Sequence, residues 1–214
     1  KIMEKPIIIF GAKGIAHPAL EIFNSHEVVV YGFLDDDATL HQKEINNISI
    51  LGNLEDDGFL KLIGQKCDAF VAVDDPKYRE TLVKLLNTRR KVQPVNAIHR
   101  LSYISTDAGI GHGNFINAKV TIGAGAEIGN HCILHTNATI EHQAKLEDFV
   151  QVGAGAIINS NVTIEKGAFI GSGVTIVAGV TIGKNARVGA GSVVIADVAS
   201  KQTVFGNPAQ AIEK

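Results

Sequence analysis

Residues 158–188 read INSNVTIEKGAFIGSGVTIVAGVTIGKNARV, and an aliphatic residue stands at every sixth position of this stretch. The same spacing runs without a break from Ile104 to Val194, through sixteen positions in one register. Four residues after these positions comes a small side chain, with Asn114 as the exception. This period predicts a parallel β-helix, in which each repeat supplies one short strand and a corner, and stacked coils enclose the core.

The corners of this predicted β-helix fall three residues after each aliphatic position. Gly, Asn or Asp occupies twelve of the sixteen corners, and these residues adopt a positive φ at low cost. The exceptions are Lys119, His131, Gln143 and Phe149. Gln143 directly follows His142, and a local rule that fails beside a histidine indicates a functional site. Three repeats per coil give about five coils and a prism on the order of 25 Å tall.

The first 95 residues follow a different pattern, in which short apolar runs alternate with helical spacing. We expect strands over residues 6–10, 28–34, 69–73 and 91–95, and helices around residues 19–23, 54–63 and 78–86. This alternation predicts a parallel α/β sheet that binds ligands at the carboxyl ends of its strands. We therefore expect two domains, a Rossmann-like domain over residues 1–95 and a β-helix with a short C-terminal tail over residues 96–214.

A glycine turn, Gly11-Ala-Lys-Gly14, joins the first predicted strand to the first helix. Glycines allow a phosphate to approach the backbone closely, and the helix N-terminus carries partial positive charge. The full dinucleotide fingerprint has a third glycine, so a tight turn that needs small residues is an equal alternative. Asp35 and Asp36 end the second strand, where an acidic side chain can bind ribose or base donors, and they favour a ligand site.

Charge, cysteine content and hydropathy exclude several classes of partner and site. The chain has 20 Lys and Arg against 22 Asp and Glu, with no long run of either sign, so we expect no nucleic-acid or lipid partner. Cys67 and Cys132 are too few and too far apart for a disulfide framework or a zinc site, which predicts a cytoplasmic location. No apolar run approaches the roughly 18 residues of a membrane span, so we expect no membrane insertion.

Several of these motifs together resemble the sugar acyltransferases of the PglD/NeuD type. The resemblance implies a left-handed β-helix, an exception to the right-handed crossover rule. It also implies a homotrimer that takes an acetyl group from acetyl-CoA and transfers it to an amino or hydroxyl group of a sugar in glycan biosynthesis. The acceptor in this family is commonly a UDP-linked 4-amino-4,6-dideoxy sugar. The matching stretches are Ile9–Gly14, Phe33–Asp36, Val95–His99, Thr139–His142 and Phe205–Ala209.

The resemblance also implies roles for individual residues. His142 becomes the general base that takes a proton from the attacking nucleophile. Gln143 stands where the family usually has a carboxylate that orients this histidine, and Gln151 stands where it usually has a second histidine. We count Gln143 and Glu141 with His142 among the catalytic residues, but alternation along the strand predicts that Glu141 points to the opposite side, so that it cannot fully replace the missing carboxylate. The acceptor nucleotide is expected at Gly11, Lys13, Gly14, Ile15, Asp35, Asp36 and Asp74, and the CoA at Gln151, Ser160, Ser172 and Ala190.

Other functions fit the residues less well. His112, His131 and His135 fall at different places in their repeats and do not converge, so we expect no metal. An NAD-linked oxidoreductase needs more strands than the first 95 residues hold. An O-acetyltransferase of a sugar hydroxyl and a non-catalytic trimeric binding protein remain open. We favour N-acetylation, because an unprotonated amine is already nucleophilic and needs a weaker base than a hydroxyl does.

Overall fold

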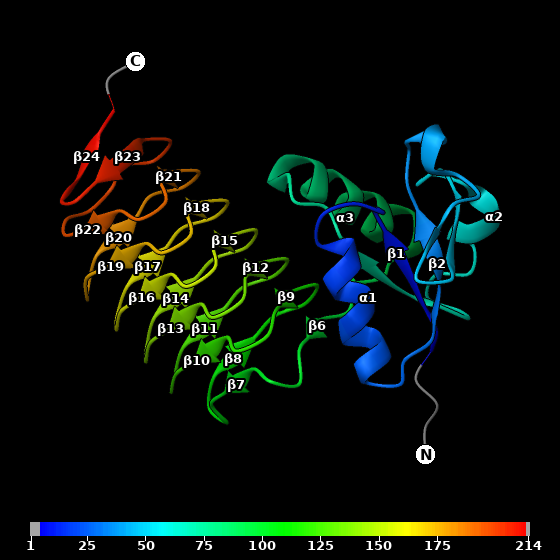
Figure 1. The fold of residues 1–214 in the computed structure, drawn as a ribbon, viewed down its shortest axis with the longest axis horizontal. Helices are drawn as coiled ribbons and strands as arrows, with labels where there is room; N and C mark the ends of the chain where they lie inside the picture. The colour runs from blue at the N-terminus through cyan, green and yellow to red at the C-terminus, as the bar shows by residue number, and fades with distance from the viewer. Residues whose placement is uncertain (1–4, 213–214) are drawn as a thin grey trace. The chain divides into compact units, whose positions relative to one another are not determined.

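The computed structural model describes residues 5–212, which form two compact units that divide between Arg100 and Leu101. None of the helices in this described part has the length and hydropathy that a membrane crossing requires. Figure 1 shows an α/β sheet with its helices in the first unit and a stack of short strands in the second.

The first unit is built on one sheet in the order β3-β4-β2-β1-β5, parallel except for the antiparallel pair β3 and β4. All four residues of β1 are buried, and α1 buries its apolar side, including Leu20 and Phe23. The ring of Phe23 meets that of Phe70 on β5 edge to face at 5.5 Å, so α1 packs on this sheet. The elements are β1 (Ile7–Phe10), α1 (Ala16–Ser25), β2 (Val30–Leu34), η1 (Ala38–Leu40), β3 (Glu44–Ile45), β4 (Ile48–Gly52), α2 (Asp57–Leu60), β5 (Asp68–Val71), α3 (Pro76–Arg90) and β6 (Ala97–Ile98).

The sequence-based assignment of this unit was wrong in one strand. Residues 91–95 form no strand, because α3 continues to Arg90 and Lys91 ends it in the left-handed region at φ 54°. The N–H of Val95 donates to the carbonyl of Ala69 at 2.9 Å. Pro94 has no N–H, so the ladder does not extend.

Two further elements differ from the prediction. The sequence pattern missed the hairpin β3–β4, whose turn residues Asn46 and Asn47 have φ values of 47° and 64°. Two successive positive φ values match the twist of a tight hairpin. The helix predicted over residues 54–63 is reduced to the single turn of α2, and turns follow it up to Gly64 at φ 81°.

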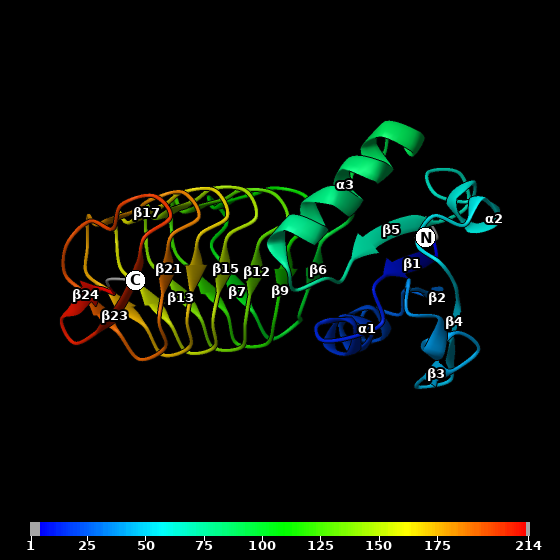
Figure 2. The same cartoon turned by 90° about the horizontal axis from the view of Figure 1, so that it is seen from above.

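The second unit is a parallel β-helix, as the six-residue period predicts, and it is left-handed, as the family resemblance implies. Each repeat from β7 to β22 contributes a two-residue strand whose second residue is the periodic aliphatic one. Figure 2 shows the successive coils stacked along the unit. The strands are β7 (Tyr103–Ile104), β8 (Gly109–Ile110), β9 (Phe115–Ile116), β10 (Thr121–Ile122), β11 (Glu127–Ile128), β12 (Ile133–Leu134), β13 (Thr139–Ile140), β14 (Lys145–Leu146), β15 (Gln151–Val152), β16 (Ile157–Ile158), β17 (Thr163–Ile164), β18 (Phe169–Ile170), β19 (Thr175–Ile176), β20 (Thr181–Ile182), β21 (Arg187–Val188), β22 (Val193–Val194), β23 (Thr203–Gly206) and β24 (Ala209–Ala211).

These strands form three faces of the prism. The first face runs β22-β19-β16-β13-β10-β7, the second β20-β17-β14-β11-β8, and the third β24-β23-β21-β18-β15-β12-β9. The aliphatic side chains point inward, and Ile122, Leu134, Ile140 and Val152 are fully buried. Asn114, the exception among the small residues, is also buried, but its side chain accepts from Cys132 N at 2.7 Å and donates to Gly129 O at 2.9 Å. Its polar atoms are therefore satisfied.

Fourteen of the sixteen corners have the predicted positive φ, including the four where the residue type departs from the rule; the exceptions are Asp107 and Asp197. Lys119, His131, Gln143 and Phe149 have φ values of 59°, 57°, 57° and 62°. A side chain in this region costs roughly 1 kcal/mol. His131 and Phe149 stack on adjacent coils with their ring centroids 5.0 Å apart, and both side chains are buried. This contact offsets the backbone cost at two of the four corners.

Candidate active site

His142 lies two residues after the end of β13, at the corner between the first and second faces, with 57% of its side chain exposed. Three backbone hydrogen bonds stack this corner coil on coil. Gln143 N–H donates to Ala124 O at 2.9 Å, Asn161 N–H to His142 O at 3.3 Å, and Gly179 N–H to Ser160 O at 3.0 Å. Ala124, His142 and Ser160 therefore occupy equivalent places on successive coils, and we call this stack the His142 corner.

Glu141 lies beside the imidazole, with its carboxylate Oε2 3.7 Å from Nδ1 of His142. The prediction that Glu141 points away from His142 was wrong. Alternation between faces applies inside a strand, but β13 ends at Ile140, and both residues belong to the corner. Gly123 on the preceding coil gives this segment room, because a Cβ there would come within 2.7 Å of His142 N.

Gln143 shapes the corner through its backbone. It holds the corner at φ 57°, and its side chain is exposed. Within residues 5–212 the side-chain amide of Gln143 makes no hydrogen bond. The carboxylate near the His142 ring therefore belongs to the preceding residue, Glu141, and the following residue, Gln143, has a neutral amide exposed to solvent.

The residues predicted to bind CoA lie in three places on the prism. Ser160 belongs to the His142 corner. Gln151 lies on β15 of the third face, where its amide nitrogen is 3.2 Å from Nε2 of His135. Ser172 and Ala190 lie at the corner between the third and first faces, where Gly191 N–H donates to Ser172 O at 2.9 Å. In a single chain the first face separates Ser172 and Ala190 from His142, and Gln151 lies on the face opposite the His142 corner.

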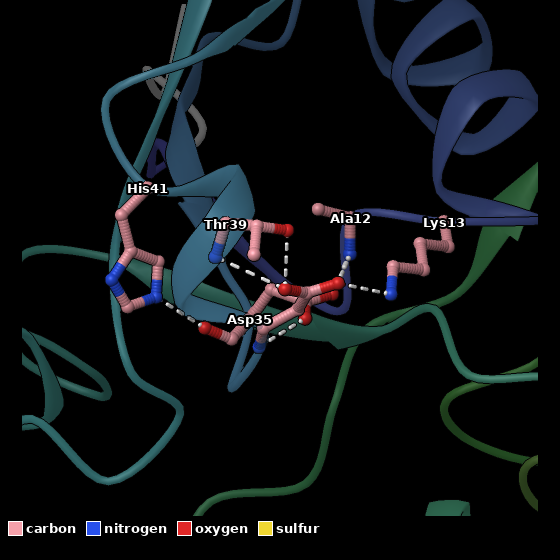
Figure 3. A network of polar contacts seen from close by, with 6 residues as sticks. Ala12, Lys13, Asp35, Thr39 and His41 are labelled. Carbon is pink, nitrogen blue, oxygen red and sulfur yellow. Dashed lines mark hydrogen bonds and ion pairs between the residues drawn. The ribbon is translucent and has the colours of Figure 1, made fainter.

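In the first unit, the carboxyl ends of β1 and β2 are held together by Asp35 (Figure 3). One oxygen of its carboxylate accepts from Ala12 N at 2.8 Å, and the other accepts from Asp37 N at 2.9 Å. The Lys13 ammonium donates to Asp37 at 2.7 Å and lowers the pKa of that carboxyl well below its usual range. The His41 ring lies 2.7 Å from the Asp35 carbonyl. Lys13 and Asp35 thus both lie at the carboxyl ends of β1 and β2, and each bonds to Asp37.

Asp36, at the carboxyl end of β2, is hydrogen-bonded to α3. Its carboxylate accepts from Tyr78 Oη at 2.8 Å and from Leu54 N at 3.1 Å. Partial burial and this hydrogen bond raise the pKa of Tyr78 to about 12. The sequence reasoning missed Tyr78 as a site residue, although it lies four residues after Asp74 in the first turn of the helix that follows β5. Tyr78 is 40% exposed.

The two glycines of the turn have a packing reason to be glycine. Gly11 has φ 103°, and a Cβ there would lie 2.6 Å from Ala72 O; Gly14 has φ 53°, and a Cβ there would strike the Asp74 carboxylate. Asp74 is exposed beside Gly14. Ile15 is buried, so its side chain belongs to the core of the unit rather than to an open site.

Among the residues that the structure describes, no group of three or more His, Cys, Asp or Glu side chains could hold a metal ion. The candidate site on the prism holds an exposed imidazole with a carboxylate beside it. The candidate site in the first unit holds carboxylates, an ammonium group and backbone amides at the carboxyl ends of β1 and β2.

A six-residue-repeat prism preceded by a small parallel α/β unit defines the class of hexapeptide transferases. Residues 107–142, 143–178 and 161–196 match the bacterial transferase hexapeptide (six repeats), and residues 6–86 match the PglD N-terminal domain. The chain belongs to the PglD/NeuD-like family of sugar acyltransferases.

Solved structures support the same assignment over nearly the whole chain. GDP-perosamine N-acetyltransferase from Caulobacter crescentus, as a histidine-to-alanine variant in complex with CoA and GDP-perosamine, is 27% identical, with a TM-score of 0.90, over 98% of this chain and 97% of that one. The acetyltransferase domain of PglB from Neisseria gonorrhoeae, in complex with acetyl coenzyme A, is 26% identical, with a TM-score of 0.90, over 98% and 100%. WeeI from Acinetobacter baumannii is 26% identical, with a TM-score of 0.87, over 97% and 99%. No curated protein sequence matches the chain.

Proposed function

We propose that the protein is an acetyl-CoA-dependent N-acetyltransferase that acetylates the amino group of a nucleotide-linked amino-deoxy sugar. The observation that carries this proposal is the match, over 98% of the chain, to an N-acetyltransferase whose structure holds CoA and GDP-perosamine. The same two-unit organisation is present here, with an exposed histidine at a corner of the prism.

His142 acts as the general base in this reaction. The sugar amine attacks the thioester carbonyl carbon of acetyl-CoA, and a new C–N bond forms as the C–S bond breaks. The imidazole takes the proton that the amine loses, and the thiolate of CoA leaves and is protonated. Backbone N–H groups of the coil are the candidate donors to the oxyanion that develops on the carbonyl.

The first unit holds the nucleotide of the acceptor. Lys13, Asp35 and Asp36 supply one cation and two carboxylates at the carboxyl ends of β1 and β2, where ligands of parallel sheets bind. The resemblance to the family favours a UDP-linked sugar, whereas the solved relative from Caulobacter crescentus holds a GDP-linked one. We propose that the acceptor is a nucleoside diphosphate sugar, and the activity assay with a GDP-linked and a UDP-linked sugar distinguishes the two nucleobases.

The second wall of the active site comes from another copy of the chain. His142 lies on an open corner, and Tyr103 and Ile157 on the adjacent first face are 64% and 42% exposed. Apolar groups on such a face favour contact with another subunit. We propose a homotrimer in the cytoplasm, with Gln151, Ser172 and Ala190 of one copy completing the CoA site beside His142 of the next. Light scattering should give about three times the 22.7 kDa chain mass, and a monomer at micromolar concentration would contradict the assembly.

The activity is tested with purified protein, acetyl-CoA and two acceptors, GDP-perosamine and a UDP-linked 4-amino-4,6-dideoxy sugar. Release of the CoA thiol and a product heavier by one acetyl group are expected with one of them. Treating the product with mild base distinguishes the two linkages, because an amide survives and an ester is cleaved. Thiol release without an acetylated sugar, or no turnover with either acceptor and no stabilisation by acetyl-CoA, would overturn the proposal.

A further inference from the structure

The charged groups near His142 single out one carboxylate. Within residues 5–212, Glu141 is the residue whose carboxylate forms a close pair with this imidazole, at 3.7 Å from Nδ1. The acidic residues on neighbouring coils have other partners. Glu127 pairs with Lys145 at 2.9 Å, Glu147 accepts from Lys166 N at 2.8 Å, and Asp107 accepts from the Ser105 hydroxyl at 2.6 Å.

The geometry of this pair gives the two ring nitrogens different tasks. Nδ1 faces the Glu141 carboxylate, so Nε2 is the nitrogen left to meet a ligand. A carboxylate near one ring nitrogen favours the tautomer that carries the proton there, and the other nitrogen then keeps its lone pair. A general base needs that lone pair directed at the nucleophile.

We propose that Glu141 is the positioning residue of this active site, holding His142 in the tautomer protonated at Nδ1 and stabilising the imidazolium that forms during transfer. The inference rests on the proposed function for its catalytic part. Glu141 touches neither substrate nor reacting atoms, and Gln143 has no part in orienting the ring.

Solvent exposure determines when this pair matters most. The side chains of His142 and Glu141 are 57% and 46% exposed, so water screens their attraction in the single chain. The present separation of 3.7 Å is longer than a hydrogen bond, and such contacts commonly tighten when substrate is bound. Closing the corner with substrate and a second subunit excludes water, which strengthens the same attraction at the moment of proton transfer.

The first test reads the ring directly and needs no substrate. Nitrogen-15 NMR distinguishes the two tautomers of a neutral histidine, and His142→Asn identifies the His142 signals among the eight histidines. In the full-length protein we expect the Nδ1-protonated form to dominate. Glu141→Ala should shift the population toward the Nε2-protonated form, whereas Gln143→Ala should leave it unchanged. An unchanged tautomer in Glu141→Ala, or an equal shift in Gln143→Ala, would overturn the proposal.

The second test measures catalysis with a matched control. Glu165 occupies the same place in its repeat as Glu141, one residue after the strand, but its carboxylate accepts from Lys184 N at 2.7 Å. We expect Glu141→Ala to lower kcat about ten- to a hundredfold, the usual effect of losing a group that orients a catalytic ligand or base, with KM for acetyl-CoA unchanged. Glu165→Ala should leave kcat near the original value.

The two tests separate the possible failures. If the tautomer shifts in Glu141→Ala while His142→Asn retains full activity, the general-base assignment fails and the positioning of the ring stands. If kcat falls equally in Glu141→Ala and Glu165→Ala, the loss is structural and the positioning role is wrong.

Discussion

At the scale of single residues, the structure shows why His142 could be found from the sequence and why the direction of Glu141 could not be predicted. A departure from the corner rule at Gln143 drew attention to the histidine beside it, and that departure is visible in sequence. The approach of Glu141 to Nδ1 depends on where β13 ends and how the corner turns. A one-residue difference in the end of a strand decides which side chains meet, and periodicity does not resolve it.

Replacing His142 with Ala should lower kcat on the order of a hundredfold or more, because a positioned general base typically contributes at least that much. His112 is a matched control, since it occupies the same place in its repeat, two residues after the strand, at a different corner. His112→Ala should retain activity when product formation is followed by mass spectrometry. Equal losses in the two variants would mean that a histidine at this place is structural, and full activity in His142→Ala would refute its role as base.

The pair of Tyr78 and Asp36 predicts an unusual titration. The pKa of Tyr78 is raised to about 12 in the folded protein, against an ordinary value of about 10. Burial of the Tyr78 hydroxyl and its hydrogen bond to Asp36 both favour the neutral form, so their contribution to stability is fully present below pH 10 and is lost as the pH rises through 12. Carbon-13 NMR of labelled tyrosine should show that Asp36→Asn moves the titration of Tyr78 toward 10, while Tyr31 and Tyr103 are unaffected. An unmoved titration would mean that the hydrogen bond is absent in solution.

At the scale of elements, the backbone conformation of a corner depends little on the type of residue that occupies it. Lys119 and Phe149 have the same backbone conformation as the glycines at equivalent corners. The spacing of the aliphatic residues, rather than the residue type at the corner, therefore determines the stacking; even Asp107, a corner residue without a positive φ, leaves the strands on either side of it in register. This is why the whole prism could be predicted from sequence. The first unit lacks such a repeated constraint, and its hairpin β3–β4 and the end of α3 were missed.

The two bulky corners should respond to glycine in opposite directions. Lys119 is exposed, so Lys119→Gly removes backbone strain and should raise the free energy of unfolding by about 1 kcal/mol. Phe149 is buried against His131, so Phe149→Gly should lower it by about 2 kcal/mol, since a loss of roughly 3 kcal/mol of packing exceeds the relieved strain. Urea denaturation measures both. A loss of stability in Lys119→Gly would show that strain is not stored at that corner.

At the scale of the whole molecule, the two units divide the proposed reaction between an acceptor site and a donor site. The glycine turn, Asp35 and Asp36 lie in the first unit, and His142 with the predicted CoA residues lies in the second. The order of the two domains was evident from the change of period near residue 100. Which copy of the chain completes each site was not, because an assembly depends on surface complementarity that a sequence pattern does not encode.

This division of tasks can be tested in the full-length chain. Gly14→Ala should disturb the turn, because its Cβ would strike the Asp74 carboxylate at a backbone φ of 53°. We expect KM for the nucleotide sugar to rise about tenfold or more while KM for acetyl-CoA stays constant. The control is Gly173→Ala, which has a similar φ of 67° but no atom within 4 Å of the added Cβ. Equal changes in both Michaelis constants for Gly14→Ala would contradict separate binding by the two units.

The hairpin β23–β24 at the end of the third face also limits the growth of the molecule. Parallel strands stacked in register about 4.8 Å apart are the geometry of a fibril, which lengthens as long as its last strand offers open backbone groups. Here β23 continues the parallel stack, but β24 turns back antiparallel and is only three residues long. A short antiparallel strand that begins after a proline is a poor template for further pairing. The chain thus uses fibril-like stacking inside each prism and ends this face in a way that hinders prisms from joining end to end.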